Sequence, residues 1–518
     1  MSDAPRHDLL TVDNLFRSAS RVYTDRPAIV SSDKSYTYGE CSDVVARLAG
    51  YLAANGIQPG DCVSTFLTNC PELPLIMFAC ARLGAVFNPI NYRLSPAELL
   101  YILDDASTKA LFYDAAGRDV VERIRDKINA GLSVCVADHG VGWFDPPGSA
   151  AAGQRSVPRN AEVGEDRDCL LIYTSGTTGK PKGVLHTQRN VVLTSLTWLL
   201  YNRIGPADRV TMLGALYHIG PLLSIFLPAV QAGAAFYIPR SMDPPDLLEY
   251  FRENDITTVW GVPTVLNNIA SRAEAAQSGL KLRLIQYSGA PMAVAVLKKI
   301  RNAFGNVSLV NAYGMTECDA VTALYAEEHD FHLGSIGKSV PNTEVRLVAM
   351  DGYDKDAVVE PGELGELVVR SPVTMSGYHN LPEKTRAVLR DGWYFTGDVA
   401  RRDRDGYLYL EGRADDLMIS GGENVSPVEV ENVLFKHPKV KEVSVAGVAD
   451  EEWGAVITAF VVRSDNSLTP AELDEFCRIS DELANYKRPR QYVFLDELPK
   501  TSSGKIDRKP LKAWKAST

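Results

Sequence analysis

The stretch at residues 173–184 has the chemistry of a site that holds a polyphosphate. It reads Tyr-Thr-Ser-Gly-Thr-Thr-Gly-Lys-Pro-Lys-Gly-Val, after an apolar run at 170–172 and before a helix expected over 190–200. Glycine lets the backbone approach a ligand closely. Backbone N–H groups and hydroxyls then donate to phosphate oxygens, and lysine adds positive charge. The Gly-x4-Gly-Lys-Ser/Thr spacing of the common nucleotide-binding loop is absent, and composition alone also allows a solvated surface turn.

A second candidate is the stretch Asn-Ala-Tyr-Gly-Met-Thr-Glu at 311–317, which follows an expected strand at 308–311. Ligands of open α/β sheets bind where strands end. Tyr313 is therefore a candidate to face a base, and Thr316 and Glu317 are candidates for phosphate and Mg²⁺. A carboxylate together with phosphate oxygens suits Mg²⁺. The alternative is a helix N-terminus with an acid in its first turn.

One further stretch and two single residues allow either a structural or a functional interpretation. Residues 420–427, Ser-Gly-Gly-Glu-Asn-Val-Ser-Pro, predict a turn that leads into a helix, with Ser426 as N-cap and Pro427 at the first helical position. Lys505 lies near the end of the chain, where an exposed lysine usually only aids solubility. His218 lies beside an apolar segment, where a histidine is more often a core residue with satisfied hydrogen bonds.

The residues at 173–184 match in order the phosphate-loop signature of the adenylate-forming superfamily. Its members are acyl-CoA synthetases, nonribosomal adenylation domains and firefly-type luciferases. The later stretches follow in the order found in that superfamily, so the chain resembles it over essentially its whole length. Within the superfamily, the chain resembles the acyl-CoA synthetases. The resemblance implies that ATP and coenzyme A are substrates and that Mg²⁺ is the metal.

The resemblance also implies roles for single residues. Catalysis is expected of Lys505, Glu317 and Thr174, and Mg²⁺ binding of Thr174 and Glu317. The residues expected to bind ATP are Thr174, Ser175, Gly176, Thr177, Thr178, Gly179, Lys180, Gly289, Ala290, Asn311, Ala312, Tyr313, Gly314, Thr316, Asp398 and Arg413. Of these, Asp398 is expected to accept from both ribose hydroxyls, assisted by Arg413; taken alone, the two would be a turn acid and a surface arginine. The loop expected to line the pantetheine tunnel contains Ser420, Gly421, Gly422 and Glu423.

The pocket for the acid is expected at four positions, His218, Val262, Thr264 and Ser288. No Arg or Lys stands at 217–220, 262–264 or 288–291. The second charge of a dicarboxylate would need a partner when buried. The sequence therefore predicts an uncharged, mainly apolar monocarboxylic acid, whether fatty, aryl or alicyclic.

The composition is that of an ordinary globular protein, with 45% hydrophobic and 23% charged residues. A net charge of −11 without a long basic run argues against nucleic acid as a partner. The 8 cysteines form no Cys-x2-Cys pair, so they indicate buried thiols and a cytoplasmic location rather than zinc or disulfides. The apolar stretch at 222–238 is interrupted by polar and helix-breaking residues, which favours a buried helix and strand over a membrane span. A homodimer is possible.

The chain of 518 residues is too long for one core. Alternating helix-like and strand-like segments predict an α/β fold with parallel sheets covered by helices. We expect αβ blocks at about 1–170 and 171–335, whose two sheets pack together, and an antiparallel, barrel-like β unit at 336–414. A small mobile α+β domain is expected at 415–518, after a hinge at Asp415 that the resemblance implies.

These inferences together predict an ATP-dependent acid–CoA ligase that forms an acyl-AMP, releases pyrophosphate and transfers the acyl group to CoA. Two alternatives remain open from the sequence. One is an enzyme of the same fold with another second step, either loading a carrier protein in trans or oxidising the adenylate. The other is a non-catalytic acyl-adenylate-binding protein, against which the intact Lys505, Glu317 and phosphate loop argue.

Overall fold

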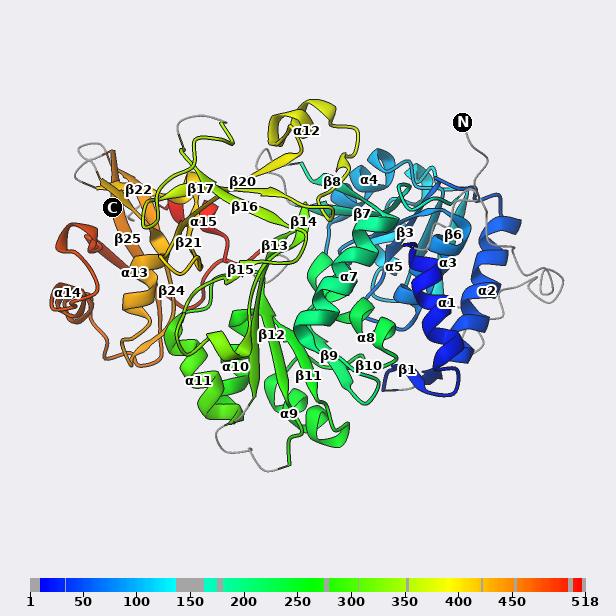
Figure 1. The fold of residues 1–518 in the computed structure, drawn as a ribbon, viewed down its shortest axis with the longest axis horizontal. Helices are drawn as coiled ribbons and strands as arrows, with labels where there is room; N and C mark the ends of the chain where they lie inside the picture. Colours follow the sequence, from blue (N-terminus) through cyan, green and yellow to red (C-terminus); the bar gives the residue numbers. More distant parts are fainter. Residues whose placement is uncertain are drawn as a thin grey trace.

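The computed structural model describes most of the chain, and its described residues are 10–32, 34–136, 163–174, 180–273, 279–305, 307–350, 354–420, 423–450, 454–501 and 506–514. Several candidate residues lie outside these ranges: Ser175, Gly176, Thr177, Thr178, Gly179, Gly421, Gly422 and Lys505. Figure 1 shows a large N-terminal domain, blue to yellow, and a smaller orange and red C-terminal domain at the opposite end of the molecule from the first helices. The predicted α/β class is confirmed.

A seven-stranded sheet forms one end of the N-terminal domain. Its strands, in spatial order, are β18 (Gly377–Tyr378), β8 (Lys182–Thr187), β7 (Asp168–Thr174), β4 (Val86–Pro89), β3 (Cys62–Phe66), β5 (Ala110–Tyr113) and β6 (Leu132–Cys135). The strands β3, β4 and β5 are short, parallel and buried throughout. Such strands need helices on both faces, which are supplied by α2 (Tyr38–Ala54), α3 (Glu72–Leu83), α4 (Pro96–Asp105) and the short α5 (Arg118–Glu122).

A nine-stranded sheet lies beside it. Its strands, in spatial order, are β15 (Lys338–Ser339), β14 (Cys318–Leu324), β13 (Ser308–Met315), β12 (Leu284–Ser288), β11 (Thr258–Gly261), β9 (Arg209–Leu213), β10 (Ala235–Tyr237), β1 (Pro27–Val30) and β2 (Ser35–Thr37). One face is covered by α9 (Pro244–Glu253), α10 (Pro263–Ala273) and α11 (Val294–Phe304). Because β1 pairs with β10, this sheet takes strands from both sides of residue 170.

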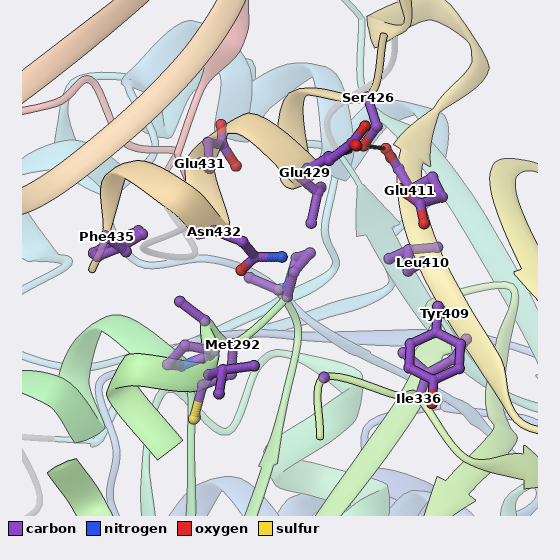
Figure 2. Close-up of a pocket in the computed structure, with 18 of the residues that line it drawn as sticks. Met292, Ile336, Tyr409, Leu410, Glu411, Ser426, Glu429, Glu431, Asn432 and Phe435 are labelled. Atoms are coloured by element: carbon purple, nitrogen blue, oxygen red, sulfur yellow. Dashed lines mark hydrogen bonds between the residues drawn. The ribbon is translucent and has the colours of Figure 1, made fainter. Parts of the chain in front are cut away.

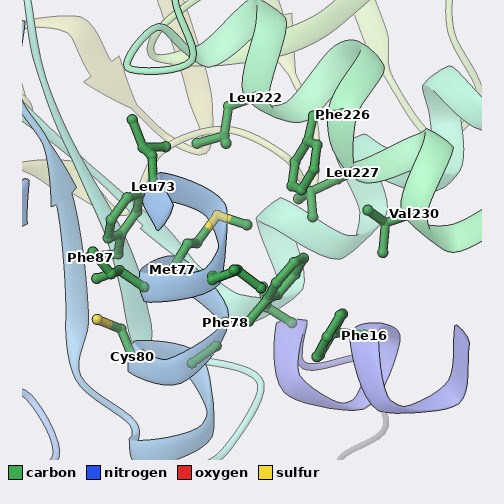
Figure 3. Close-up of a cluster of buried hydrophobic side chains, with 14 of the residues drawn as sticks. Phe16, Leu73, Met77, Phe78, Cys80, Phe87, Leu222, Phe226, Leu227 and Val230 are labelled. Atoms are coloured by element: carbon green, nitrogen blue, oxygen red, sulfur yellow. The ribbon is translucent and has the colours of Figure 1, made fainter. Parts of the chain in front are cut away.

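The apolar core between the two sheets is made by helices. They are α1 (Val12–Val22), α3, α7 (Gln188–Asn202), the π-helix η3 (Gly220–Phe226) and α8 (Leu227–Ala232). Phe16, Phe78 and Phe226 form a row in this core (Figure 3), with ring centroids 4.1 Å apart for the first pair and 6.0 Å for the second. The apolar stretch at 222–238 is thus a buried helix followed by β10, as expected. Among the described residues, no helix is long and apolar enough to cross a membrane.

The last part of the chain contains an antiparallel sheet and the C-terminal domain. The antiparallel sheet contains β16 (Glu344–Val348), β17 (Gly365–Arg370), β19 (Leu389–Arg390), β20 (Trp393–Arg402) and β21 (Leu408–Arg413), with α12 (Pro382–Val388) beside it. The C-terminal elements are β22 (Met418–Ser420), β23 (Glu423–Val425), α13 (Pro427–Leu434), β24 (Val440–Asp450), β25 (Gly454–Arg463), α14 (Pro470–Arg478), β26 (Gln491–Leu495) and α15 (Arg508–Lys512). Ser426 accepts from the backbone N–H of Glu429 and Pro427 opens α13, so the predicted capping is confirmed.

The helix expected over 190–200 is found as α7. It is preceded by β8, which turns back and pairs antiparallel with β7, so Thr174 faces Lys182. One local expectation was wrong. The stretch at 311–317 is neither a strand-end loop nor a helix N-terminus, because it lies in β13 and in the turn to the antiparallel β14. Gly314 explains the close turn, since a Cβ there would lie 2.0 Å from the Asp319 carbonyl oxygen.

Candidate active site

A cavity of about 900 Å³ lies between the nine-stranded sheet, the antiparallel sheet and the C-terminal domain. Figure 2 shows Tyr409, Leu410 and Glu411 of β21 on one side and residues of α13 on another, with Met292 and Ile336 of the N-terminal domain facing them. Ten of the predicted site residues line it: Val262, Thr264, Gly289, Ala290, Asn311, Ala312, Tyr313, Gly314, Asp398 and Arg413. These residues come from five separate segments, so the fold gathers them at one place.

The best-defined polar group in the cavity is Asp398 on β20. Its neighbour in the sheet register is Arg413, at the end of β21. The Arg413 guanidinium donates to Oδ1 of Asp398 at 2.9 Å, and the Tyr313 hydroxyl donates to Oδ2 at 2.6 Å. Burial, reinforced by the Asp398 charge, raises the pKa of Tyr313 well above its ordinary value, so this hydroxyl remains a donor. Gly397 permits the pairing, because a Cβ there would lie 2.8 Å from Arg413 Nη2.

A second polar group surrounds Glu317. The Tyr378 hydroxyl donates to Glu317 Oε1 at 2.7 Å, and the Lys182 ammonium lies 3.3 Å from the same hydroxyl and 4.3 Å from the ring centroid. Burial lowers the pKa of Lys182, while the Glu317 charge acts in the opposite direction. Arg413 also acts electrostatically on Lys182 and on Tyr378. The polar groups around Asp398 and around Glu317 therefore belong to one electrostatic site.

His186 fixes the turn that carries Glu317. Its Nε2 lies 2.7 Å from the Thr316 carbonyl oxygen, which can only accept, so Nε2 is the protonated nitrogen. Burial lowers the pKa of His186, so the ring is neutral at pH 7. A neutral histidine holds the turn without adding charge to the site.

Six other predicted residues are absent from the described lining of the cavity. As far as the described residues define the lining, it does not include Thr174, Lys180, Thr316, Glu317, His218 or Ser288. Thr174 ends β7, where its hydroxyl lies 3.5 Å from the Lys182 carbonyl oxygen. Ser288 is the sheet partner of Ala312, and the ring of His218 lies 4.4 Å from that of Tyr217. Lys180 lies over the ring of Tyr101 at 5.4 Å.

The expected hinge lies in a short 3₁₀ turn, Ala414–Asp416, directly after β21. Asp415 is exposed, and the Lys512 ammonium donates to its carbonyl oxygen at 2.6 Å and pairs with Asp416 at 2.6 Å. Ser420 and Glu423 of the expected CoA loop end β22 and begin β23, which pair with each other.

Sequence reasoning did not assign functional roles to Lys182, Tyr378 or His186. Lys182 was visible in the signature stretch at 173–184, as its second lysine. Tyr378 lies in no recognised stretch and reaches the site because β18 pairs with β8, which places Tyr378 beside Val184. No local pattern marks such a long-range pairing.

The chain matches two family models, described as AMP-binding enzyme over residues 15–379 and AMP-binding enzyme C-terminal domain over residues 429–505. An indoleacetate–CoA ligase of Aromatoleum aromaticum is 34% identical over 484 residues, 93% of each chain. A long-chain-fatty-acid–CoA ligase of Mycobacterium tuberculosis is 33% identical over 490 residues, 94% of this chain and 95% of that one. The crystal structure of an anthranilate CoA ligase with bound anthranoyl-AMP superposes with a TM-score of 0.88 at 27% identity, covering 97% of this chain and 96% of that one.

The two matched regions and the shared fold agree with one another. The chain belongs to the AMP-binding enzyme family and, within it, to the AMP-forming acyl-CoA synthetases.

Proposed function

We propose that this acyl-CoA synthetase activates an uncharged, mainly apolar monocarboxylic acid. The observation that supports this choice is the pairing of the cations at the cavity. Among the described residues, the Lys and Arg side chains of its lining are Arg401, Arg413, Lys487 and Arg508. Each is paired with a carboxylate: Glu411, Asp398, Glu429 and Glu431 respectively. A second carboxylate on the substrate would be buried without a cation of its own, which is costly.

In the first half-reaction a carboxylate oxygen of the acid attacks the α-phosphorus of ATP, and the bond to pyrophosphate breaks. Asp398 orients the nucleotide by accepting hydrogen bonds from the ribose hydroxyls. These hydroxyls replace the Tyr313 hydroxyl, which donates to Asp398 in this structure. Lys182 and Lys180 follow the loop at 175–179 in the chain and would meet phosphate oxygens. Lys505 is proposed to stabilise the negative charge that develops between the carboxylate and the α-phosphate. No side-chain nucleophile is required, so catalysis rests on positioning and charge.

The residues near Glu317 fit a magnesium ion. Among the described residues no cluster of three or more His, Cys, Asp or Glu could enclose a metal ion. Mg²⁺ needs no such cage, because it is usually held by one or two carboxylates together with substrate phosphates and waters. Glu317 and the Thr174 hydroxyl are hard oxygen donors of the suitable kind. Bound there, Mg²⁺ would neutralise phosphate charge.

In the second half-reaction the thiol sulfur of CoA attacks the acyl carbonyl carbon, and AMP leaves. The loop at 420–427 is proposed to line the path of the pantetheine arm. Rotation about the turn at Asp415 would bring that loop to the site and carry Lys505 away. Such boundary residues absorb domain motions through a few backbone dihedrals.

A panel of acids tests this proposal directly. Purified enzyme with ATP, Mg²⁺ and CoA should release AMP with fatty, aryl or alicyclic acids, and mass spectrometry should detect the matching CoA ester. Faster turnover of malonate or succinate than of every apolar acid would contradict the proposed substrate class. A product formed only with an added carrier protein in place of CoA would contradict the acceptor.

A further inference from the structure

Strand β20 contains a bulge that ends in Asp398. Along β17, a single residue, Leu367, separates the two residues that pair with β20 on either side. Along β20, the matching gap contains three residues, 396–398. A bulge bends its strand and re-aims a side chain, and bulges are common next to active sites. The direction of the Asp398 carboxylate therefore depends on how this bulge is held.

Thr396 ties the first and last residues of the bulge to the neighbouring strands. Its hydroxyl donates to the carbonyl oxygen of Leu367 on β17 at 2.7 Å and accepts from the backbone N–H of Asp398 at 2.9 Å. Its own carbonyl oxygen accepts from the Arg413 guanidinium of β21 at 2.9 Å. Because Thr396 is buried, water does not compete for these bonds. The backbone at both ends of the bulge is therefore fixed.

Glu366 of β17 holds the middle residue of the bulge. The backbone N–H of Gly397 donates to Oε1 of Glu366 at 3.0 Å. The extra residues of a bulge lie outside the hydrogen-bond ladder of the sheet, so this N–H needs a partner other than the neighbouring backbone. Gly397 has a φ of 72°, a left-handed conformation that glycine adopts without strain. The Glu366 carboxylate therefore fixes the bulge residue whose backbone is the most free to move.

A shift at Gly397 would reach both members of the Asp398–Arg413 pair. Gly397 directly precedes Asp398, and a Cβ on Gly397 would lie 2.8 Å from Nη2 of Arg413. Arg413 in turn donates to Oδ1 of Asp398 at 2.9 Å. Burial raises the pKa of Glu366; the Asp398 charge adds to this rise and the Arg413 charge opposes it. Glu366 therefore interacts with the pair through space as well as through the backbone of Gly397.

We propose that Glu366 is a positioning residue for nucleotide binding, which holds the bulge that aims Asp398 at the ribose. This inference rests on the proposed function, in which Asp398 accepts from the ribose hydroxyls. Glu366 is absent from the described residues that line the cavity, so it acts through Gly397 and does not touch the nucleotide. Without the Glu366 oxygen, the Gly397 N–H loses its acceptor and the bulge relaxes. The Asp398 carboxylate then no longer points where both ribose hydroxyls can donate to it.

A reciprocal pair of substitutions separates the hydrogen bond of Glu366 from its charge. Glu366→Gln keeps the length of the side chain and an acceptor oxygen but removes the charge. Glu366→Asp keeps the charge but is one methylene shorter, which withdraws the acceptor from the Gly397 N–H. The Kd for AMP, measured by isothermal titration calorimetry, should rise by about 10-fold or more in Glu366→Asp and by less than about 5-fold in Glu366→Gln, because a neutral acceptor forms about half as strong a bond.

The KM for the acid should stay unchanged in both variants, since the bulge holds the ribose end of the site. A general loss of packing would alter this KM as well. A Glu366→Asp variant that binds AMP as the wild type does would overturn the inference. A Glu366→Gln variant that binds AMP more weakly than Glu366→Asp would also overturn it, because the charge and not the hydrogen bond would then be the cause.

A double variant tests whether Glu366 acts through Asp398. Adding Glu366→Asp to Asp398→Ala should change the Kd for AMP by less than about 2-fold, because two changes that act on one contact are not additive. A further loss of about 10-fold in the double variant would overturn the inference and leave the proposed function intact. If Asp398→Ala alone binds AMP as the wild type does, the ribose contact of the proposed function is contradicted, and the inference is contradicted with it.

Glu363→Ala is the matched control. The Glu363 side chain also accepts from a backbone N–H at 3.0 Å, that of Glu360, in the turn before β17. This variant should bind AMP as the wild type does, and a loss equal to that of Glu366→Asp would overturn the inference. Circular dichroism identifies the folded variants. If Glu366→Asp does not fold, Glu366→Gln decides alone, and a rise of more than about 5-fold in its Kd for AMP would overturn the inference.

Discussion

The hydroxyl of Tyr378 donates to Oε1 of Glu317 at 2.7 Å. This bond joins β18, which follows the antiparallel sheet's β17 in the chain, to the turn between β13 and β14. Lys182 of the phosphate-loop hairpin lies against the same phenol ring. Three segments that are far apart in the sequence therefore meet at the proposed magnesium ligand, and the pairing of β18 with β8 brings the segments of Tyr378 and Lys182 together.

Removing the Glu317 charge should lower the rate of adenylation more than removing the Tyr378 hydroxyl does. Glu317→Gln is expected to lower acid-dependent ATP–pyrophosphate exchange by about 10²–10³-fold and to raise the Mg²⁺ concentration at half-maximal rate. Tyr378→Phe removes one hydrogen bond and should cost only about 10-fold. The measurement is exchange rate against Mg²⁺ concentration for both variants. A wild-type Mg²⁺ dependence in Glu317→Gln would remove Glu317 from the metal site.

Removing Asp398 should weaken nucleotide binding. Asp398→Ala deletes the acceptor for the ribose hydroxyls and leaves Arg413 without its carboxylate partner. Hydrogen bonds to a charged group contribute about 1.5–3 kcal/mol, so the Kd for AMP should rise by about 10–100-fold. Isothermal titration calorimetry with AMP measures this directly. Glu344→Ala, which removes an exposed partner of Arg370, is the control and should bind AMP normally; equal weakening in both would indicate a general loss of folding.

Proline at the proposed hinge should separate the two half-reactions. Asp415→Pro fixes φ at that residue and should hold the C-terminal domain in one orientation. Pyrophosphate release in a single turnover is expected to persist, while CoA ester formation falls. Asp415→Ala, which keeps the backbone free, should retain both steps. Equal loss of both steps in the proline variant would make position 415 structural.

Removing the Lys505 ammonium should impair the first half-reaction and spare the second, which is the opposite of the effect expected for Asp415→Pro. Lys505→Ala is expected to reduce acyl-adenylate formation by about 10²–10³-fold and to largely spare conversion of a supplied acyl-adenylate to the CoA ester. The nearby exposed Lys509 offers a matched control, and Lys509→Ala should leave both steps unchanged. The two half-reactions are measured separately on purified protein. Near-normal adenylation by Lys505→Ala would assign the residue to the solvated tail.

The buried carboxyl of Asp319 should make stability depend on pH. Its Oδ2 accepts from Trp198 Nε1 at 3.1 Å and from the Ser224 hydroxyl at 2.7 Å, but burial dominates and raises its pKa to about 6. The folded state therefore holds this proton more tightly than the unfolded state. The free energy of unfolding should fall as pH rises from about 4 to about 6, by on the order of 2–3 kcal/mol.

Asp319→Asn tests that pH dependence. Both donors reach the same oxygen, so the amide oxygen of asparagine can replace it and keep both bonds. The variant should gain stability relative to wild type above about pH 6, and the difference should vanish toward about pH 4. Urea unfolding at several pH values measures it, with the exposed Glu344→Gln as control. A constant difference across this pH range would show that Asp319 does not titrate there.

Local sequence was enough for several elements and for part of the candidate site. The start of α13, for example, was expected with Ser426 as N-cap and Pro427 at the first helical position, and both are found there, because helix caps are local signals. The ribose and base positions Tyr313, Asp398 and Arg413 were assigned through a resemblance carried by short ordered motifs, and the structure brings them into contact. Ser175 to Gly179 and Lys505, in contrast, are still assigned by resemblance alone.

What the sequence determined by itself is the α/β class, the order of most helices and strands, and the chemical types of the residues in the nucleotide motifs. Hydrophobic periodicity shows which side of an element is buried, but it does not show which other element will lie against that side. Only the tertiary structure decided that β1 joins β10, that β8 folds back on β7, and that β18 brings Tyr378 to Glu317. It also decided that Gly397, in the bulge that carries Asp398, donates to Glu366. These contacts join residues far apart in the chain, and close packing of the whole core selects them.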